Sequence, residues 1–272
     1  MTDRVRADLG GVPETALWTL FQRAAEASRP DAVLDDPLAV ELVARIDHPF
    51  GERFGPPRLA QWQALRARCF DRAVRRFLDA HPGATVVALG EGLETQFWRV
   101  DDGRVTWIGV DGAETVALRE RLLPASPRLR AVSGSALDLA CADAVPDGAE
   151  VLVTAQGLLM YLEPAQVHGL IVGLARRFSG GRLVFDAVPA WSAALSRRGW
   201  LVAGDGYRPP PWPWGMDAQE ERRIAGLPGV ASLTGLRLPR GRGPVFGAAL
   251  PLLARMGWAR RRMLTVFEAV FA

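Results

Sequence analysis

Five short apolar runs recur through the middle of the chain, and they constrain its fold more than any other feature of the sequence. They occupy residues 85–89, 105–110, 129–132, 150–155 and 182–188, and helical stretches separate most of them, notably 113–122 and 164–178. Apolar runs of this length are typical of strands buried on both faces, and strands that alternate with helices indicate a parallel sheet. The chain is therefore predicted to be an α/β protein.

The flanking segments have other patterns. Helices are predicted from Pro13 to Ala27, from Asp36 onward, and over 58–80, where apolar residues recur at spacings of three and four. Prolines between 209 and 213 exclude a regular helix or central strand over 201–216, so this segment is predicted to be a loop, either a lid or a surface excursion. Residues 263–271 resemble a closing strand.

Composition excludes several kinds of chemistry. All 33 basic residues are arginine, which excludes lysine nucleophiles, Schiff bases and lysine-dependent phosphate loops. The net charge is only +3, and the arginine cluster in 66–76 is interpreted as a solvated helix face rather than a nucleic-acid site. Cys69 and Cys141 lie far apart and have no metal-ligand spacing with any histidine, so no metal is expected.

The sequence also indicates a location for the chain. No apolar run is long enough to span a bilayer, and the first eleven residues do not have the pattern of a signal peptide. We therefore expect a cytoplasmic protein without a membrane partner.

Polar and small residues follow the first two apolar runs where a ligand would bind. In an open parallel sheet, ligands lie beyond the carboxyl ends of the strands. Gly90 and Gly92 follow the first run, but Thr95 occupies the place of the third glycine in the dinucleotide fingerprint, so pyrophosphate binding loses support. A plain turn is the alternative. Asp111 ends the second run and suits the hydroxyls of a ribose, or caps the next helix.

The segment 135–139 follows the third run. Asp138 could accept the amino group of an adenine, and Leu139 could offer its backbone amide and apolar cover to the ring, although a capping aspartate is the alternative. Ribose and adenine recognition without pyrophosphate recognition indicates an adenosine-type cofactor.

Four segments resemble the leucine carboxyl methyltransferase family: VVALGEGLETQFWR at 86–99, WIGVD at 107–111, SALD at 135–138 and AQGLLMYL at 155–162. The segments ETALWTLFQRAAEAS (14–28) and DDPLA (35–39) extend the resemblance, which runs from about Glu14 to Asp186. The resemblance is closer to the bacterial branch of the family, which includes O-methyltransferases of polyketide biosynthesis.

This resemblance implies a fold and a cofactor. The fold is a Rossmann-like class I methyltransferase sheet, mostly parallel with its last strand antiparallel, with a helical N-terminal cap and an inserted lid. The cofactor is S-adenosylmethionine, with S-adenosylhomocysteine as product. We expect a single methyltransferase domain over 1–272, comprising a cap at 1–80, a cofactor-binding core at 81–190, a lid and substrate region at 191–260 and a closing strand at 261–272.

The resemblance also implies roles in cofactor binding. Gly90 lies under the methionine moiety, in the same turn as Gly92, and Asp111 holds the ribose. Asp138 and Leu139 hold the adenine. Arg66 matches the arginine that pairs with the cofactor carboxylate, with Arg68 as a rival.

The chain departs from the family pattern near the methionine moiety. The family carries a glutamate where this chain has Gln156, which can hydrogen-bond the cofactor amino group but cannot form an ion pair with it. Glu91 replaces a small residue, and Gln96 stands where the family often has arginine. We expect the Glu91 carboxylate to compensate for Gln156; otherwise cofactor affinity is weaker or the chain is a non-catalytic relative.

The scarcity of bases predicts the nucleophile. Methyl transfer from a sulfonium is an in-line displacement, and an ionised carboxylate needs no base, whereas a phenol does. His48 alone among the histidines could reach the site, which favours a carboxylate of a small acidic metabolite. Tyr161 and Gln156 are the catalytic candidates, and Tyr161, Asp186 or Glu91 could serve as base for a phenol.

An anionic substrate requires cationic partners and, if flat, aromatic walls. The candidate cations are Arg23, where the family's first helix contributes a basic residue, Arg197, Arg198 and Arg208, and the candidate walls are Trp191, Trp200, Trp212 and Trp214. The rival functions are a phenolic O-methyltransferase, a protein carboxyl methyltransferase, a non-catalytic cofactor-binding protein and, least favoured, a nicotinamide dehydrogenase. A monomer or a homodimer is compatible with the sequence.

Overall fold

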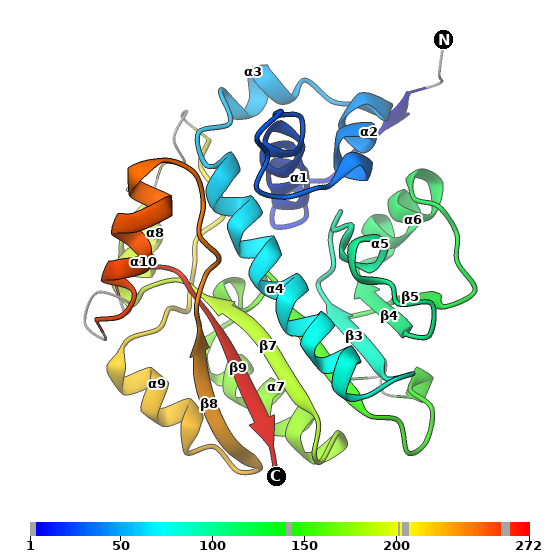
Figure 1. Ribbon diagram of the computed structural model, residues 1–272, viewed down its shortest axis with the longest axis vertical. Helices are drawn as coiled ribbons and strands as arrows, with labels where there is room; N and C mark the ends of the chain where they lie inside the picture. Colours follow the sequence, from blue (N-terminus) through cyan, green and yellow to red (C-terminus); the bar gives the residue numbers. More distant parts are fainter. Residues whose placement is uncertain (1–3, 140–142, 201, 203–206, 257–261) are drawn as a thin grey trace.

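The computed structural model describes residues 4–139, 143–200, 202, 207–256 and 262–272. Its centre is a seven-stranded sheet with the strand order β5-β4-β3-β6-β7-β9-β8 (Figure 1). The strands are β3 (Thr85–Leu89), β4 (Thr106–Asp111), β5 (Leu129–Ser133), β6 (Val151–Ala155), β7 (Arg182–Ala187), β8 (Val230–Leu236) and β9 (Thr265–Phe271). The five predicted runs therefore form strands within one or two residues of their expected bounds.

The last strand runs against its neighbours. Strands β3 to β7 pair in parallel, whereas β9 pairs antiparallel with β7 on one side and with β8 on the other. The expected sheet is confirmed, with one addition. Strand β8 comes from the segment 191–260, which was expected to form a lid, and it occupies the edge of the sheet.

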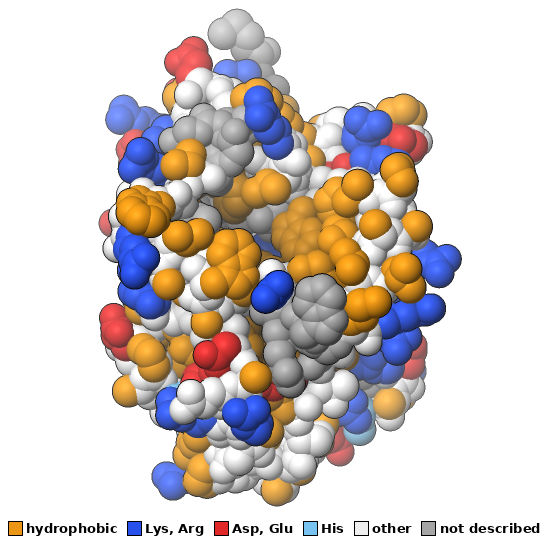
Figure 2. Space-filling model, turned by 90° about the vertical axis from the view of Figure 1, so that its left-hand side faces the viewer, with side chains coloured by type: hydrophobic (Ala, Val, Ile, Leu, Met, Phe, Trp, Pro, Cys, Tyr) orange, Lys and Arg blue, Asp and Glu red, His pale blue; other side chains and the backbone are white. Residues whose placement is uncertain are grey.

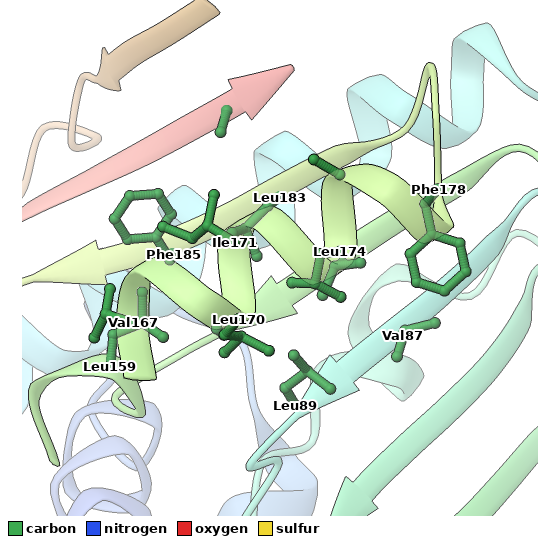
Figure 3. Close-up of a cluster of buried hydrophobic side chains, with 14 of the residues drawn as sticks. Val87, Leu89, Leu159, Val167, Leu170, Ile171, Leu174, Phe178, Leu183 and Phe185 are labelled. Atoms are coloured by element: carbon green, nitrogen blue, oxygen red, sulfur yellow. The ribbon is translucent and has the colours of Figure 1, made fainter. Parts of the chain in front are cut away.

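Helices cover both faces of the sheet. Alternate residues of β3 point to opposite sides, so Val86 and Ala88 face α4 (Ala60–Ala80), while Val87 and Leu89 face α7 (Pro164–Arg177). Figure 3 shows the second face, where Leu170, Ile171 and Leu174 of α7 lie against the strands. Helix α5 (Gln96–Val100) shares the α4 face, and α9 (Ala218–Ala225) shares the α7 face.

A helical layer lies beyond the carboxyl ends of the parallel strands. It comprises α1 (Glu14–Ala27), α2 (Pro37–Arg45) and α3 (Phe50–Phe54), with a short two-stranded sheet of β1 (Val5–Arg6) and β2 (Ile46–Asp47). Asp36 caps α2 by accepting a hydrogen bond from the Ala39 amide, and Pro37 occupies the first helical position. This layer packs on α6 (Ala113–Leu122) through Leu118 and Leu122.

Helix α4 belongs to both layers. Its contacts with α1 are extensive, but its later residues, including Phe70, Val74 and Phe77, pack on the sheet. The expected cap at 1–80 therefore includes a helix that is also the main cover of one sheet face. Cys69 is buried in this helix, and Cys141 lies outside the described residues.

The last third of the chain supplies α8 (Ala190–Arg197), a π-helix at Val245–Ala249 and α10 (Leu250–Leu253). Between α8 and α9, the proline-rich segment is a loop, as predicted, and it is fixed to the core by Trp214, which is buried and donates its indole N–H to Glu220 at 2.8 Å. None of the described helices is both long and apolar enough to cross a lipid bilayer.

Candidate active site

A cavity of about 250 Å³ lies where the carboxyl ends of β3, β4 and β6 meet the helical layer. Parallel strands bring their following loops to one edge of the sheet, and α1 and α4 close this edge from above (Figure 1). The strand-end residues on its wall are Gly90, Glu91, Gly92, Glu94, Asp111, Gln156 and Gly157. The helices contribute Thr15, Trp18, Arg23, Trp62, Gln63 and Arg66.

The loop after β3 depends on two glycines. Gly90 and Gly92 have φ angles of +59° and +55°, a region that side chains disfavour. A Cβ atom at Gly90 would lie 2.9 Å from the Leu158 side chain, and one at Gly92 would lie 3.0 Å from Ala16. The turn therefore leaves bare backbone beside the cavity, which allows a ligand to approach closely.

Asp111 joins this loop to the end of β4. Its carboxylate accepts hydrogen bonds from the Gly92 amide at 2.7 Å and from the Gly112 amide at 2.7 Å. The side chain is half exposed and borders the cavity. Its remaining lone pairs can accept hydrogen bonds from a ligand that carries hydroxyl groups.

Gln156 ends β6 and contacts a carboxylate that the sequence reasoning missed. Its Nε2 donates to Glu94 Oε2 at 3.0 Å, while its Oε1 is buried without a partner. Burial alone would raise the pKa of Glu94, but the guanidiniums of Arg23 and Arg99 lower it to about 2. Glu94 is therefore a fixed negative charge behind Gln156.

Glu94 is the member of a buried ionic cluster that faces the cavity. Arg99 pairs with Glu94 at 2.8 Å, Asp36 at 2.9 Å and Asp71 at 2.8 Å, and Arg23 pairs with Glu94 at 3.2 Å and Asp36 at 3.3 Å. Two guanidiniums against three carboxylates leave one formal negative charge, which a cation in the cavity would neutralise. Arg23, expected as a substrate contact, lines the cavity, and its guanidinium is paired with both Glu94 and Asp36.

Glu91, which was expected to compensate for Gln156, makes its side-chain contacts with other residues. Its carboxylate accepts a hydrogen bond from the Trp107 indole at 2.8 Å and pairs with Arg119 at 2.8 Å. Burial raises the pKa of Glu91, which Arg119 and Trp107 oppose. The residue lies on the cavity wall and its carboxylate contacts β4 and α6, whereas the carboxylate that contacts Gln156 is that of Glu94.

Arg66 approaches the cavity from α4. Its Nη1 donates to Asp186 at 2.9 Å, and the same carboxylate accepts the Gly157 amide at 2.6 Å. A Cβ atom at Gly157 would lie 3.2 Å from Arg66, so the missing side chain leaves room for the guanidinium. The rival, Arg68, does not line this cavity but another, beside Asp71 and Arg99.

Several polar atoms around the cavity have no hydrogen-bond partner. They are Gln63 Oε1, Arg66 Nε, Gln156 Oε1 and Trp212 Nε1, and all four are buried in side chains that line the cavity. Buried polar groups without a partner are rare because they lose solvation without compensation. The cavity therefore offers both donors and acceptors to a polar ligand.

The two residues expected to bind adenine do not border this cavity. Asp138 and Leu139 follow β5 but are not among the residues that border the cavity. Leu139 has a φ of +53°, and its side chain packs against Gly173 of α7, where a Cβ atom would lie 2.7 Å away. The next residues, 140–142, are outside the described part of the chain.

Two of the expected substrate residues are turned elsewhere. Arg197 is exposed and donates to the carbonyl of Pro213 at 3.1 Å, and Arg208 is exposed and donates to that of Gly199 at 3.1 Å. Both therefore support the loop backbone, and neither lines the cavity. Of the four tryptophans expected as walls, Trp212 alone lines it; Trp191 and Trp200 are 54% and 68% exposed.

Tyr161 and Trp212 also line the cavity. Tyr161 lies in the turn after β6, and Trp212 lies in the proline-rich loop. They pack together over Met160 and Val188. Burial raises the pKa of Tyr161, so its hydroxyl stays protonated. The pair presents an O–H and an indole N–H, and the indole lies close enough to the Tyr161 hydroxyl to oppose the effect of burial on its pKa, without meeting hydrogen-bond geometry.

The residues of α1 on the wall were also missed. Thr15, Trp18 and Thr19 border the cavity, whereas Leu17 and Leu20 of the same helix are fully buried. The sequence contained a pattern that could have identified them. The face of the helix that does not carry the buried leucines has two hydroxyls and an indole at helical spacing.

The profile of the leucine carboxyl methyltransferase family matches residues 16–175. This chain belongs to that family. It is a methyltransferase that uses S-adenosylmethionine. The strand-end cavity offers an open glycine turn, the half-exposed Asp111 and unpartnered donors and acceptors.

Named relatives agree with this assignment. The chain is 34% identical over 222 residues to the tetracenomycin polyketide synthesis O-methyltransferase TcmP of Streptomyces glaucescens, covering 80% of this chain and 81% of the relative. It is 32% identical over 206 residues to the S-adenosylmethionine-dependent methyltransferase dpfgK of Gibberella zeae, covering 68% and 69%.

Solved structures support the fold. A Bordetella parapertussis protein described as a possible exported protein superposes with a TM-score of 0.56 at 18% identity, over 94% of this chain and 79% of that one. A Listeria monocytogenes protein described as a putative S-adenosylmethionine-dependent methyltransferase gives 0.50 at 16% identity, over 76% and 99%.

Proposed function

We propose that this O-methyltransferase methylates a carboxylate of a small acidic metabolite. The observation that carries the proposal is the lack of a general base: no histidine or cysteine is among the described residues that line the cavity. An ionised carboxylate attacks a methyl group without losing a proton, whereas a phenol must be deprotonated.

Glu94, Tyr161 and Asp186, three acidic or phenolic groups at the site, are poor bases. The pKa of Glu94 is about 2, and two arginines hold its carboxylate. The pKa of Tyr161 is raised by burial, so the phenol keeps its proton at neutral pH. Asp186 is fully buried and is engaged by Arg66 and the Gly157 amide.

Tyr161 and Trp212 suit an acceptor carboxylate. Their hydroxyl and indole are neighbouring donors, and the indole N–H makes no hydrogen bond of good geometry with any described residue. A carboxylate that accepts both hydrogen bonds would be oriented without being protonated. Tyr161 is thus proposed to position the nucleophile and not to act as a base.

The cofactor would lie along the strand ends. S-adenosylmethionine, when bound, supplies a methyl group on a sulfonium sulfur. We assign its ribose to Asp111, its ammonium to Gln156 with Glu94 behind it, and its carboxylate to the unpartnered Nε of Arg66. The adenine is assigned to Asp138 and Leu139 as the family resemblance implies. The enclosing helices would exclude water while the two reactants are aligned.

The named relatives suggest the class of acceptor. TcmP is described as acting in polyketide synthesis, and the alignment covers most of both chains. An aromatic polyketide acid would match a cavity bordered by Trp18, Trp62 and Trp212.

The test is the chemical nature of the product. The protein is incubated with methyl-labelled S-adenosylmethionine and paired aromatic acids and phenols of the same ring system. We expect label in products that release methanol in mild alkali, as methyl esters do, and not in alkali-stable methyl ethers. Trp212→Phe should raise KM for the acid by about tenfold through the lost N–H donor, whereas Trp191→Phe, at an exposed position, should not. Alkali-stable products alone would establish a phenolic methyltransferase instead.

A further inference from the structure

A second and larger cavity adjoins the active-site cavity. This groove, of about 590 Å³, lies between α4, the loop after β8, the π-helix with α10, and the start of β9. Among the described residues, Trp62 and Leu264 line both cavities and therefore lie between them. The Trp62 ring lies 6.2 Å from the Phe246 ring, which lines the groove.

The interior of the groove is apolar. Leu65, Phe246, Leu250, Pro251, Ala254 and Met263 contribute to its wall. Figure 2 shows hydrophobic side chains gathered around a hollow on the side of the molecule that carries α8 and α10, with basic side chains between them. The π-helix that supplies Phe246 is a rare element, found frequently at functional sites.

The rim of the groove is basic and lacks a counter-charge. Its lining includes Arg72, Arg237, Arg240 and Arg255, and no aspartate or glutamate is among the described lining residues. No hydrogen bond or ion pair joins any of these four side chains to another residue in the described ranges. Arg242, two residues beyond the rim, is different, since it pairs with Glu26 and Asp31 and fastens this loop to α1.

We propose that the groove binds the distal part of the methyl acceptor, an apolar ring system or chain that carries a second anionic group. This inference rests on the proposed function. The acceptor would present its reacting carboxylate at Tyr161 and Trp212, pass Trp62 and Leu264, and place its distal anion among the rim arginines. Unpaired guanidiniums over an apolar floor match an amphipathic anion in both charge and polarity.

The first experiment needs no methyl transfer. The probe is 8-anilinonaphthalene-1-sulfonate, an apolar ring system with one sulfonate, and its uncharged counterpart is N-phenyl-1-naphthylamine. Arg240→Gln with Arg255→Gln should weaken sulfonate binding about tenfold, and Ala254→Trp, which fills the groove, should abolish it. Arg130→Gln is the matched control, because Arg130 is exposed and unpaired on β5 at the opposite edge of the sheet. S-adenosylmethionine should bind with the same affinity to the wild type, the double arginine variant, Ala254→Trp and Arg130→Gln.

The second experiment compares acceptors. With acids that the enzyme methylates, Arg240→Gln with Arg255→Gln should raise KM about tenfold for acceptors with a distal anion and leave short monoacids unchanged. Equal sulfonate binding in wild type and variants, or an unchanged KM for the longer acids, would overturn the groove assignment while leaving carboxylate methylation intact. Arginine-dependent sulfonate binding without methyl ester formation would support the groove as an anion site and contradict carboxylate methylation. Methyl transfer only to acids attached to a carrier protein would exclude a free small molecule as the occupant of the groove.

Discussion

At the scale of single residues, Asp111 carries a specific expectation for cofactor binding. Its carboxylate holds the Gly92 and Gly112 amides, and it is the group assigned to the ribose. Asp111→Ala should weaken S-adenosylmethionine binding by at least about tenfold, because hydrogen bonds to a charged acceptor each contribute roughly 1.5–3 kcal/mol. Titration calorimetry measures the change.

Two variants make this result interpretable. Asp111→Asn keeps one carbonyl oxygen for the Gly92 amide and should retain the fold, while still losing affinity. Glu114→Ala removes an exposed carboxylate three residues further along and should bind like the wild type. Wild-type affinity in both Asp111 variants would remove this residue from the binding site.

Gln156→Glu should restore the family pattern and yet destabilise the unliganded protein. The new carboxylate would lie beside Glu94, in a cluster that already carries one excess negative charge. Like charges raise the pKa of the new group in the folded state, so stability should fall as pH rises above the ordinary glutamate value. The expected deficit is roughly 2 kcal/mol near neutral pH and smaller near about pH 5.

Thermal unfolding at these two pH values tests this expectation, and Gln166→Glu supplies the same chemical change at an exposed site. S-adenosylmethionine should stabilise Gln156→Glu more than it stabilises the wild type, because its ammonium would offset the added charge. Equal stability of the variant and the wild type at both pH values would contradict the role given to Glu94.

The contrast between Glu91 and Glu94 shows what residue patterns leave undecided. Both follow β3 within the glycine turn, and the sequence favoured Glu91 as the partner of Gln156. The outcome depends on distant groups: Trp107 and Arg119 hold Glu91, while Arg23 and Arg99 hold Glu94. Side-chain direction in a turn is set by such tertiary partners, which spacing along the chain does not reveal.

At the scale of elements, the glycine turn after β3 can be tested against a matched position. Gly90 and Gly103 have φ angles of +59° and +79°, but a Cβ atom meets Leu158 at 2.9 Å in the first and nothing within 4 Å in the second. Both alanine variants should lose about 1–2 kcal/mol from the strained backbone. Only Gly90→Ala should also lose cofactor affinity, since Leu158 borders the cavity.

Urea unfolding and calorimetry on the two glycine variants give the two readouts. A similar loss of cofactor affinity in Gly103→Ala would show that the turn after β3 has no special part in binding.

Two of the predicted strands, β3 and β6, differ in burial from the missed strand β8. The runs at 85–89 and 151–155 are buried at every position, and their apolar pattern was sufficient to locate them. Strand β8 reads Val-Ala-Ser-Leu-Thr-Gly-Leu and has no fully buried residue, because it lies at the sheet edge. Its place depends on pairing with β9, a long-range contact that leaves no periodic pattern in the sequence.

At the scale of the whole molecule, β9 joins the last third of the chain to the core. Phe267 of β9 is buried and stacks on Phe185 of β7 with ring centroids 5.6 Å apart. Phe267→Ala should lower the free energy of unfolding by about 3–5 kcal/mol. Leu252→Ala, at a position 57% exposed, should change it by less than about 0.5 kcal/mol.

Equilibrium urea unfolding measures both values. A loss for Phe267→Ala no larger than that for Leu252→Ala would mean that β9 contributes little to the stability of the sheet.

The position of β9 also bears on how the chain is made. Strand β8 has β9 as its neighbour in the sheet, and β9 follows it in the chain by about thirty residues that include the wall of the groove. On the ribosome, β8 therefore emerges before the strand with which it pairs, and this pairing forms only once β9 has been synthesised and inserted beside β7. The half of the sheet that carries the glycine turn can assemble once β7 has emerged, whereas the groove is completed only when β9 has followed.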